Sequence, residues 1–221
     1  MDIKCIFFDL DGTLYPASTG LWLAIKQRID CYLQTQMHFS PEQAQTIRQN
    51  YLEKYGTTLR GLQMEHKVDV HAYLDFVHDL PIEQYLHPDP ELVQLIRTLK
   101  IPKWIFTNSD RKHALRILSF LGLENEFEGI IDIHALNYIC KPQPEAYHTA
   151  IKIANQSQPG NCLFIDDSPV NIKCAKTLGF LTVFVSDNGN HAPADHTVNH
   201  LDELPRLYPD LWSLRARSIT P

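Results

Sequence analysis

The sequence contains no cluster of lysine and arginine residues and no long apolar run. Its 20 basic residues are outnumbered by 26 acidic ones, which gives a formal net charge of -6. We therefore expect no binding to a nucleic acid polymer, because such binding needs a basic surface. No apolar stretch approaches the ~18 residues of a membrane-spanning helix, so no membrane association is expected. The acidic motif that begins at Asp9 leaves, on this interpretation, no room for a signal peptide.

Cysteine is scarce, and no two cysteines form a CxxC pair. The five cysteines are Cys5, Cys31, Cys140, Cys162 and Cys174. An odd number without paired spacing argues against a disulfide framework or a structural zinc site, and predicts reduced thiols in the cytoplasm. The chain of 221 residues is 44% hydrophobic and 21% charged, which is typical of one large folded domain, or of one domain carrying an insertion.

Short apolar runs alternate with segments of helical periodicity over most of the chain. The apolar runs cover 4–9, 103–108, 129–133, 161–166 and 181–185, and a last short strand is expected at 196–198. Segments 110–121, 145–154 and 170–178 place their apolar residues on one helical face. Continuous apolarity predicts strands that are buried on both faces. The alternation predicts an α/β fold with a doubly wound parallel sheet.

One long segment after the first strand lacks any strand signal. Helices are predicted instead at 21–33, from 40 towards 51 or 55, at 62–66 and at 71–80. Ser40 and Pro41 have the residue types of a helix N-cap and first helical position. A crossover between parallel strands needs only about a dozen residues. We therefore predict an inserted helical subdomain at 17–84, with 1–16 and 85–221 forming the core, to which a helix at 89–99 returns the chain.

Polar side chains follow the predicted strands at the points where the strands end. Asp9 and Asp11 follow the first strand, and Thr107 and Asn108 follow the second. Asp166 and Asp167 close a later strand. Lys141 lies in the loop after the third predicted strand, 129–133. Ligands of open α/β sheets bind at the carboxyl ends of the strands. These seven residues are therefore expected to form one site.

This set of residues suits phosphoryl transfer. Crowded carboxylates need a cation, and Mg²⁺ is a hard cation that prefers oxygen ligands. One carboxylate can attack phosphorus to give an aspartyl-phosphate, and a second, two residues further on, can act as acid and then as base. Thr107, Asn108 and Lys141 are the candidates for binding the remaining phosphate oxygens.

Four segments in this order resemble the motifs of the haloacid dehalogenase-like hydrolase superfamily. They are 8–14 (FDLDGTL), 105–108 (IFTN), 141–142 (KP) and 164–168 (FIDDS), the last followed by Asn171. The resemblance implies a Rossmann-like core, and it implies that the insertion at 17–84 is a helical cap.

The resemblance also implies individual roles. Asp9 would be the nucleophile and Asp11 the general acid and base. Mg²⁺ would be held by Asp9, by the backbone carbonyl of Asp11 and by Asp166. Asp167 would lie behind these ligands and orient Lys141. The acid at Asp11 favours phosphate transfer, because dehalogenases of this superfamily lack an acid at that position.

A finer likeness is to the pyrimidine 5'-nucleotidase branch. It rests on 7–15, on 51–62 continuing to 66–68, and on His113 after the second motif. Gly12 departs from it, since the branch often has Asn there. The likeness implies hydrolysis of a nucleoside 5'-monophosphate, pyrimidine by preference, and makes Arg60 and His66 candidates for contact with sugar or base.

Other interpretations remain open on the sequence. The same chemistry would serve a phosphatase for a sugar phosphate or another small metabolite, or a mutase. A receiver-type signalling module also uses acids, Thr, Lys and Mg²⁺, but its phosphorylated Asp ends a middle strand, whereas Asp9 ends the first one here. The chain is expected to be a monomer or a homodimer.

Overall fold

The computed structural model describes residues 2–186 and 189–212. Six parallel strands form one sheet in the order β5-β4-β1-β6-β7-β8. They are β1 (Cys5–Phe8), β4 (Lys103–Phe106), β5 (Gly129–Ile131), β6 (Cys162–Asp166), β7 (Leu181–Val185) and β8 (His196–Val198). All six strands predicted from the sequence are confirmed. A separate pair, β2 (Asp11–Gly12) and β3 (Tyr15–Pro16), follows β1 directly.

β1 explains why the predicted strands show no polar alternation. It pairs with β4 on one side and β6 on the other, and its four residues are completely buried. Ile6 and Phe8 belong to one core cluster, and Cys5 and Phe7 belong to another on the opposite face of the sheet. A strand covered on both faces needs apolar side chains at every position.

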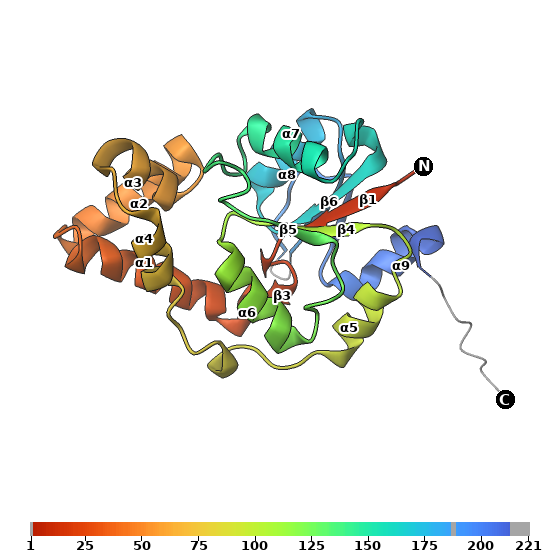
Figure 1. Cartoon of the computed structure of the whole chain (residues 1–221), viewed down its shortest axis with the longest axis horizontal. Helices are drawn as coiled ribbons and strands as arrows, with labels where there is room; N and C mark the ends of the chain where they lie inside the picture. The colour runs from red at the N-terminus through yellow and green to blue at the C-terminus, as the bar shows by residue number, and fades with distance from the viewer. Residues whose placement is uncertain (1, 187–188, 213–221) are drawn as a thin grey trace.

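Helices cover both faces of this sheet (Figure 1). α5 (Pro90–Arg97), α6 (Arg111–Leu121) and α9 (Leu204–Leu207) pack on one face, and α7 (Pro144–Ile153) and α8 (Pro169–Thr177) pack on the other. The chain runs from β1 outward through β4 and β5, and then returns past β1 to β6, β7 and β8. The predicted doubly wound, Rossmann-like α/β class is confirmed, and the direction of winding reverses at β1, where such folds bind ligands.

Four further helices lie beyond the carboxyl ends of the strands (Figure 1). They are α1 (Leu21–Thr35), α2 (Pro41–Tyr55), α3 (Thr58–His66) and α4 (Val70–Val77), and they share an apolar cluster of their own. Among the described residues, no helix is long and apolar enough to cross a membrane.

The helix boundaries follow from their caps. Ser40 and Gln43 form a capping box at the start of α2 with Pro41 in the first turn, which confirms the predicted start. α3 begins at Thr58 rather than at 62, because the Thr57 side chain accepts a hydrogen bond from the Arg60 backbone N–H and caps the helix. α4 ends at Val77, three residues earlier than predicted.

Candidate active site

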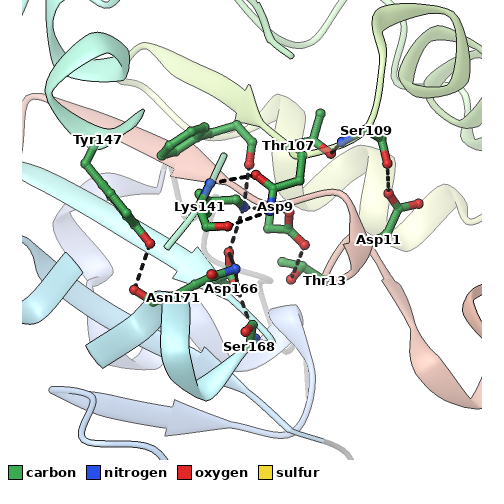
Figure 2. A network of polar contacts seen from close by, with 12 residues as sticks. Asp9, Asp11, Thr13, Thr107, Ser109, Lys141, Tyr147, Asp166, Ser168 and Asn171 are labelled. Carbon is green, nitrogen blue, oxygen red and sulfur yellow. Dashed lines mark hydrogen bonds and ion pairs between the residues drawn. The ribbon is translucent and has the colours of Figure 1, made fainter. Parts of the chain in front are cut away.

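Lys141 joins two carboxylates that come from different strands. Its Nζ donates hydrogen bonds of 2.7 Å to Asp9 Oδ1, to Asp166 Oδ2 and to the backbone carbonyl of Phe106 (Figure 2). All three protons of the ammonium group are thereby used. Because its side chain is only 1% exposed, Lys141 is an internal cation held entirely by the carboxyl edge of the sheet.

The charges in this cluster and its burial shift the pKa values of Lys141 and Asp9. Burial alone would lower the pKa of Lys141, but the carboxylates of Asp166 and Asp9 outweigh it and raise that pKa above its usual range. Burial raises the pKa of Asp9 to about 7, even though the Lys141 charge opposes the shift. One ammonium group therefore does not balance the surrounding acids, and a further cation would stabilise their ionised forms.

Asp166 is fixed by the start of α8. Its Oδ1 accepts hydrogen bonds from the Ser168 backbone N–H (2.8 Å) and from Asn171 Nδ2 (3.0 Å). Tyr147 holds the same helical turn, because its hydroxyl donates to the Asn171 carbonyl (2.9 Å). The carboxylate at the end of β6 is thus rigidly oriented towards Lys141 and Asp9 (Figure 2).

The structure contains a candidate cation site made only of carboxylates. Oxygen atoms of Asp9, Asp166 and Asp167 lie within 4.8 Å of one another. Burial, and then the charges of Asp9 and Asp166, raise the pKa of Asp167 to about 8. Such an all-oxygen set fits Mg²⁺, so the side chains that are present are compatible with the metal that the sequence resemblance implies. The three donors of Lys141 are occupied by other groups, so Asp166 rather than Asp167 forms the hydrogen bond that orients the lysine.

Gly12 allows this arrangement. It adopts a φ of +91°, and a Cβ atom built there would lie 2.3 Å from Asp167 Oδ2. A residue without a side chain is required both by the backbone conformation and by the close approach of Asp167.

Asp11 belongs to a separate polar group. Its carboxylate accepts hydrogen bonds from the Tyr15 hydroxyl (2.6 Å), the Ser109 hydroxyl (2.7 Å) and His113 Nε2 (2.7 Å). Burial alone would raise the pKa of Asp11, but the interactions with His113, Tyr15 and Ser109 outweigh it and hold that pKa well below its usual range. The sequence alone does not indicate that Tyr15 and Ser109 bind Asp11, because neither has a spacing that marks it as a partner of that residue.

Thr107 and Asn108 follow β4, as predicted, and both line a cavity at the carboxyl edge of the sheet. Thr107 is buried, and its Oγ1 accepts a hydrogen bond from the Ser109 backbone N–H (3.0 Å). The Asn108 side chain donates to the Lys141 carbonyl (3.0 Å) and accepts from the Lys141 N–H (2.8 Å). The amide of Asn108 therefore holds the backbone that carries Lys141.

A cavity of about 360 Å³ lies between the carboxyl edge of the sheet and helices α1, α2, α3 and α4. Its polar floor contains Asp9, Asp11, Thr107, Asn108, Lys141 and Asp167. Its helical wall is mainly apolar and aromatic, with Trp22 and Tyr73, and it carries the cationic groups of Lys26 and Arg48. The cavity thus joins an acidic, lysine-containing end to an apolar end.

The structure does not bring Arg60 and His66 to this cavity, since neither lines it. The first residues of α3, Thr58 and Leu59, line the cavity, whereas His66 is exposed at the other end of the same helix, with Nε2 2.9 Å from the Tyr51 hydroxyl. Lys26 and Arg48, which the sequence analysis did not single out, line the wall instead. Arg48 is paired with Asp30 (2.7 Å), whereas Lys26 has no ion pair within the part of the chain that the structure describes.

The fold and the site together define a Rossmann-like α/β protein with a carboxylate and lysine cluster at the end of its central strand. A family model described as haloacid dehalogenase-like hydrolase matches residues 3–179. The chain therefore belongs to the haloacid dehalogenase-like hydrolases.

A yeast protein is similar to most of this chain. Phosphate metabolism protein 8 of Saccharomyces cerevisiae is 34% identical over 190 residues, which are 80% of this chain and 59% of the yeast protein. The chain thus spans less than two thirds of the length of that relative.

Among solved structures, the HAD hydrolase YfnB of Bacillus subtilis, bound to magnesium, has a TM-score of 0.64 at 19% identity, covering 94% of this chain and 99% of that one. A HAD phosphatase from Thermococcus onnurineus has a TM-score of 0.63 at 20% identity, covering 93% and 97%. At these identities the two structures support the fold alone.

Proposed function

We propose that this hydrolase is a Mg²⁺-dependent phosphomonoesterase that acts through an aspartyl-phosphate on Asp9. Its preferred substrate would be a nucleoside 5'-monophosphate, most favourably a pyrimidine one. The observation that carries the proposal is the position of Asp9, at the floor of the cavity, held by the buried ammonium group of Lys141 and two residues before a second acid.

In the first step, a carboxylate oxygen of Asp9 attacks phosphorus and the bond to the ester oxygen breaks. Asp11 supplies the proton that the departing alcohol needs, and it takes this proton up before the step, because the three hydrogen-bond donors around it favour the carboxylate in the structure without substrate. In the second step, Asp11 accepts a proton from water, and the water oxygen attacks the aspartyl-phosphate. Inorganic phosphate leaves and the Asp9 carboxylate is restored.

The buried cation contributes to both steps. Lys141 fixes the orientation of the Asp9 carboxylate and offsets the negative charge that gathers around phosphorus. Asp9, Asp166 and Asp167 are the side chains that would hold Mg²⁺, which supplies further charge neutralisation when bound. The clustering of their oxygens and the raised pKa of Asp167 support this assignment over Asp167 as an orienting residue alone.

We further propose that residues 17–84 form a cap over a core of 1–16 and 85–221. The cavity supports this division, because one wall comes from helices α1 to α4 and its floor comes from the strand ends. Trp22 offers a flat apolar surface to a nucleobase, and the Lys26 ammonium group, 5.4 Å from the centre of the Trp22 ring, offers a hydrogen-bond donor to its carbonyl groups. The names of the yeast relative and of the Thermococcus structure are consistent with phosphate chemistry.

We also propose a cytoplasmic location. All five cysteines are free thiols, and three of them are buried. Free buried thiols are compatible with a reducing compartment.

The test is phosphate release from a panel of 5'-nucleotides and sugar phosphates, with and without Mg²⁺, for the wild type and for Asp9→Asn. A preference for UMP or CMP that needs Mg²⁺ and is lost in the variant would support the whole proposal. Activity on sugar phosphates alone would retain the chemistry and reject the nucleotide. Conversion of a sugar phosphate to its isomer without phosphate release would reveal a mutase, and a stable phosphoprotein without turnover would reveal a receiver.

A further inference from the structure

Two buried histidine rings connect the segment after α4 to Asp11. His78 and His113 stack with ring centroids 4.1 Å apart and an interplanar angle of 16°. Each ring also binds a carboxylate: His78 Nδ1 lies 2.7 Å from Asp110 Oδ2, and His113 Nε2 lies 2.7 Å from Asp11 Oδ1. The four side chains form one continuous array at the edge of the cavity.

His113 has few hydrogen bonds of its own to fix its ring. His113 Nε2 lies 2.7 Å from Asp11 Oδ1, the oxygen that also accepts from the Tyr15 hydroxyl, and this is the hydrogen bond that the ring makes through its side chain. His113 Nδ1 is buried and has no hydrogen-bond partner within residues 2–186 and 189–212. Besides its contact with Asp11, the ring is therefore placed by α6 and by the face of His78.

His78 is itself firmly anchored on α6. Asp110 binds the His78 ring with one oxygen and, with the other, accepts from the His113 backbone N–H (2.8 Å) as the N-cap of α6. Arg116 donates to the carbonyls of His78 (2.9 Å) and Leu80 (2.8 Å). The segment after α4 is thus attached to the start and to the middle of the same helix.

We propose that His113 is a positioning residue for Asp11, and that His78 holds the His113 ring in the orientation this requires. The inference rests on the proposed function, in which Asp11 transfers the proton to and from the reacting oxygens. Proton transfer needs the acid within hydrogen-bond reach of the leaving oxygen, so a misplaced Asp11 slows that transfer. The attack by Asp9 itself is not affected, because Asp9 is held by Lys141.

The choice of leaving group separates these two effects. An alcohol leaves phosphorus with the help of a proton, whereas p-nitrophenolate is a stable anion that leaves without one. We would compare the kcat/KM of UMP and β-glycerophosphate, which release alcohols, with that of p-nitrophenyl phosphate, because kcat/KM reports the first step alone, whereas the second step, in which Asp11 acts as base, is common to all three esters. General acid catalysis contributes roughly 10²–10⁴-fold. Since Tyr15 and Ser109 still bind Asp11 when the imidazole is removed, we expect His113→Leu to lose about 10–100-fold on the alkyl esters and about 3-fold or less on the aryl ester.

Conservative variants test the geometry directly. His113→Gln keeps an N–H that can reach Asp11, and should recover most of the alkyl ester activity. His78→Phe keeps the stacked ring and should lose less than His78→Leu. The matched control is His71→Leu: His71 stacks on His134 with centroids 4.9 Å apart, away from Asp11 and outside the cavity. It should leave the ratio of the two substrate classes unchanged, and thermal melting would report the stability of every variant.

A selective loss on alkyl esters in His113→Leu, with recovery in His113→Gln, would support the inference. Equal losses on both substrate classes would overturn it, because they would mean that His113 has only a structural role, and so would the absence of any loss. A wild type that hydrolyses none of the three esters would instead overturn the proposed function, and this inference with it.

Discussion

The buried ammonium group of Lys141 gives a quantitative prediction for Lys141→Met. Lys141 and Asp166 are each 1% exposed at the side chain, and Asp9 is 11% exposed, with both contacts at 2.7 Å. Removing one partner of a buried ion pair costs about 3–5 kcal/mol, because the remaining charge is left without compensation. The variant should therefore be less stable than the wild type by about that amount.

The loss should depend on pH. The Lys141 charge lowers the pKa of Asp9, so in the variant this pKa lies above the wild-type value of about 7, and below it Asp9 takes up a proton and part of the uncompensated charge disappears. We expect the destabilisation of Lys141→Met to be about 3 kcal/mol near pH 6 and to rise towards about 5 kcal/mol as pH increases above 7. For a chain of this size, these values correspond to a fall of roughly 6–20 °C in melting temperature.

Urea denaturation of Lys141→Met and of the matched variant Lys176→Met would check the value. Lys176 pairs with Asp195 at 2.9 Å, but the two side chains are 41% and 34% exposed. Loss of such a pair costs about 0–1 kcal/mol. Equal destabilisation in the two variants would refute the view that Lys141 compensates buried charge.

Further predictions concern the nucleophile, the candidate metal site and the cavity wall. Asp9→Asn should lower kcat by on the order of 10⁴-fold or more in a phosphate-release assay, because the nucleophile is lost. Gly12→Ala should cost about 1–2 kcal/mol through its positive φ, and should weaken Mg²⁺ binding by roughly 10-fold in calorimetry by displacing Asp167. Since the folded protein raises the pKa values of Asp9 and Asp167 to about 7 and about 8, it holds protons that the unfolded chain releases near pH 4. The stability of the metal-free protein should then fall as pH rises from about 4 to about 8 and level off above that, and the increase in melting temperature on adding Mg²⁺ should grow as pH rises towards 8. Lys26→Met should raise the KM for UMP about 10-fold, which is the loss of about one hydrogen bond from a charged donor, and should affect p-nitrophenyl phosphate less.

Each of these predictions can fail in a specific way. Turnover by Asp9→Asn would reject Asp9 as nucleophile, and unchanged Mg²⁺ affinity in Gly12→Ala would remove Asp167 from the metal site. A stabilisation by Mg²⁺ that does not vary with pH would contradict the raised pKa values. Equal KM changes for both substrates in Lys26→Met would exclude a contact between Lys26 and the nucleobase.

The core and its polar edge could be predicted from the sequence because both depend on local patterns. A strand buried on both faces must be apolar throughout, so the runs that end before Asp9, Thr107 and Asp167 were recognisable without any knowledge of their partners. Parallel strands then bring their carboxyl ends to one edge, which is sufficient to place these residues and Lys141 together.

The partners of individual side chains depended on the tertiary structure. The distance in sequence between Asp11 and His113 contains no signal of their contact, which exists because α6 starts beside the β2–β3 turn and presents its first inward-facing ring there. The orienting hydrogen bond of Lys141 similarly goes to Asp166, because the start of α8 turns that carboxylate inward.

The wall of the cavity also depends partly on local sequence patterns and partly on tertiary packing. The sequence by itself determined that 17–84 would be helical, since periodicity and caps such as Ser40 are local features. Which helical faces meet the strand ends was decided only by how the four helices pack on one another and on the core, so that Lys26 and Arg48 line the cavity and Arg60 and His66 do not. Periodicity identifies the apolar face of a helix. The polar residues beside that face contact whichever element packs against it, and only the folded structure determines which element that is.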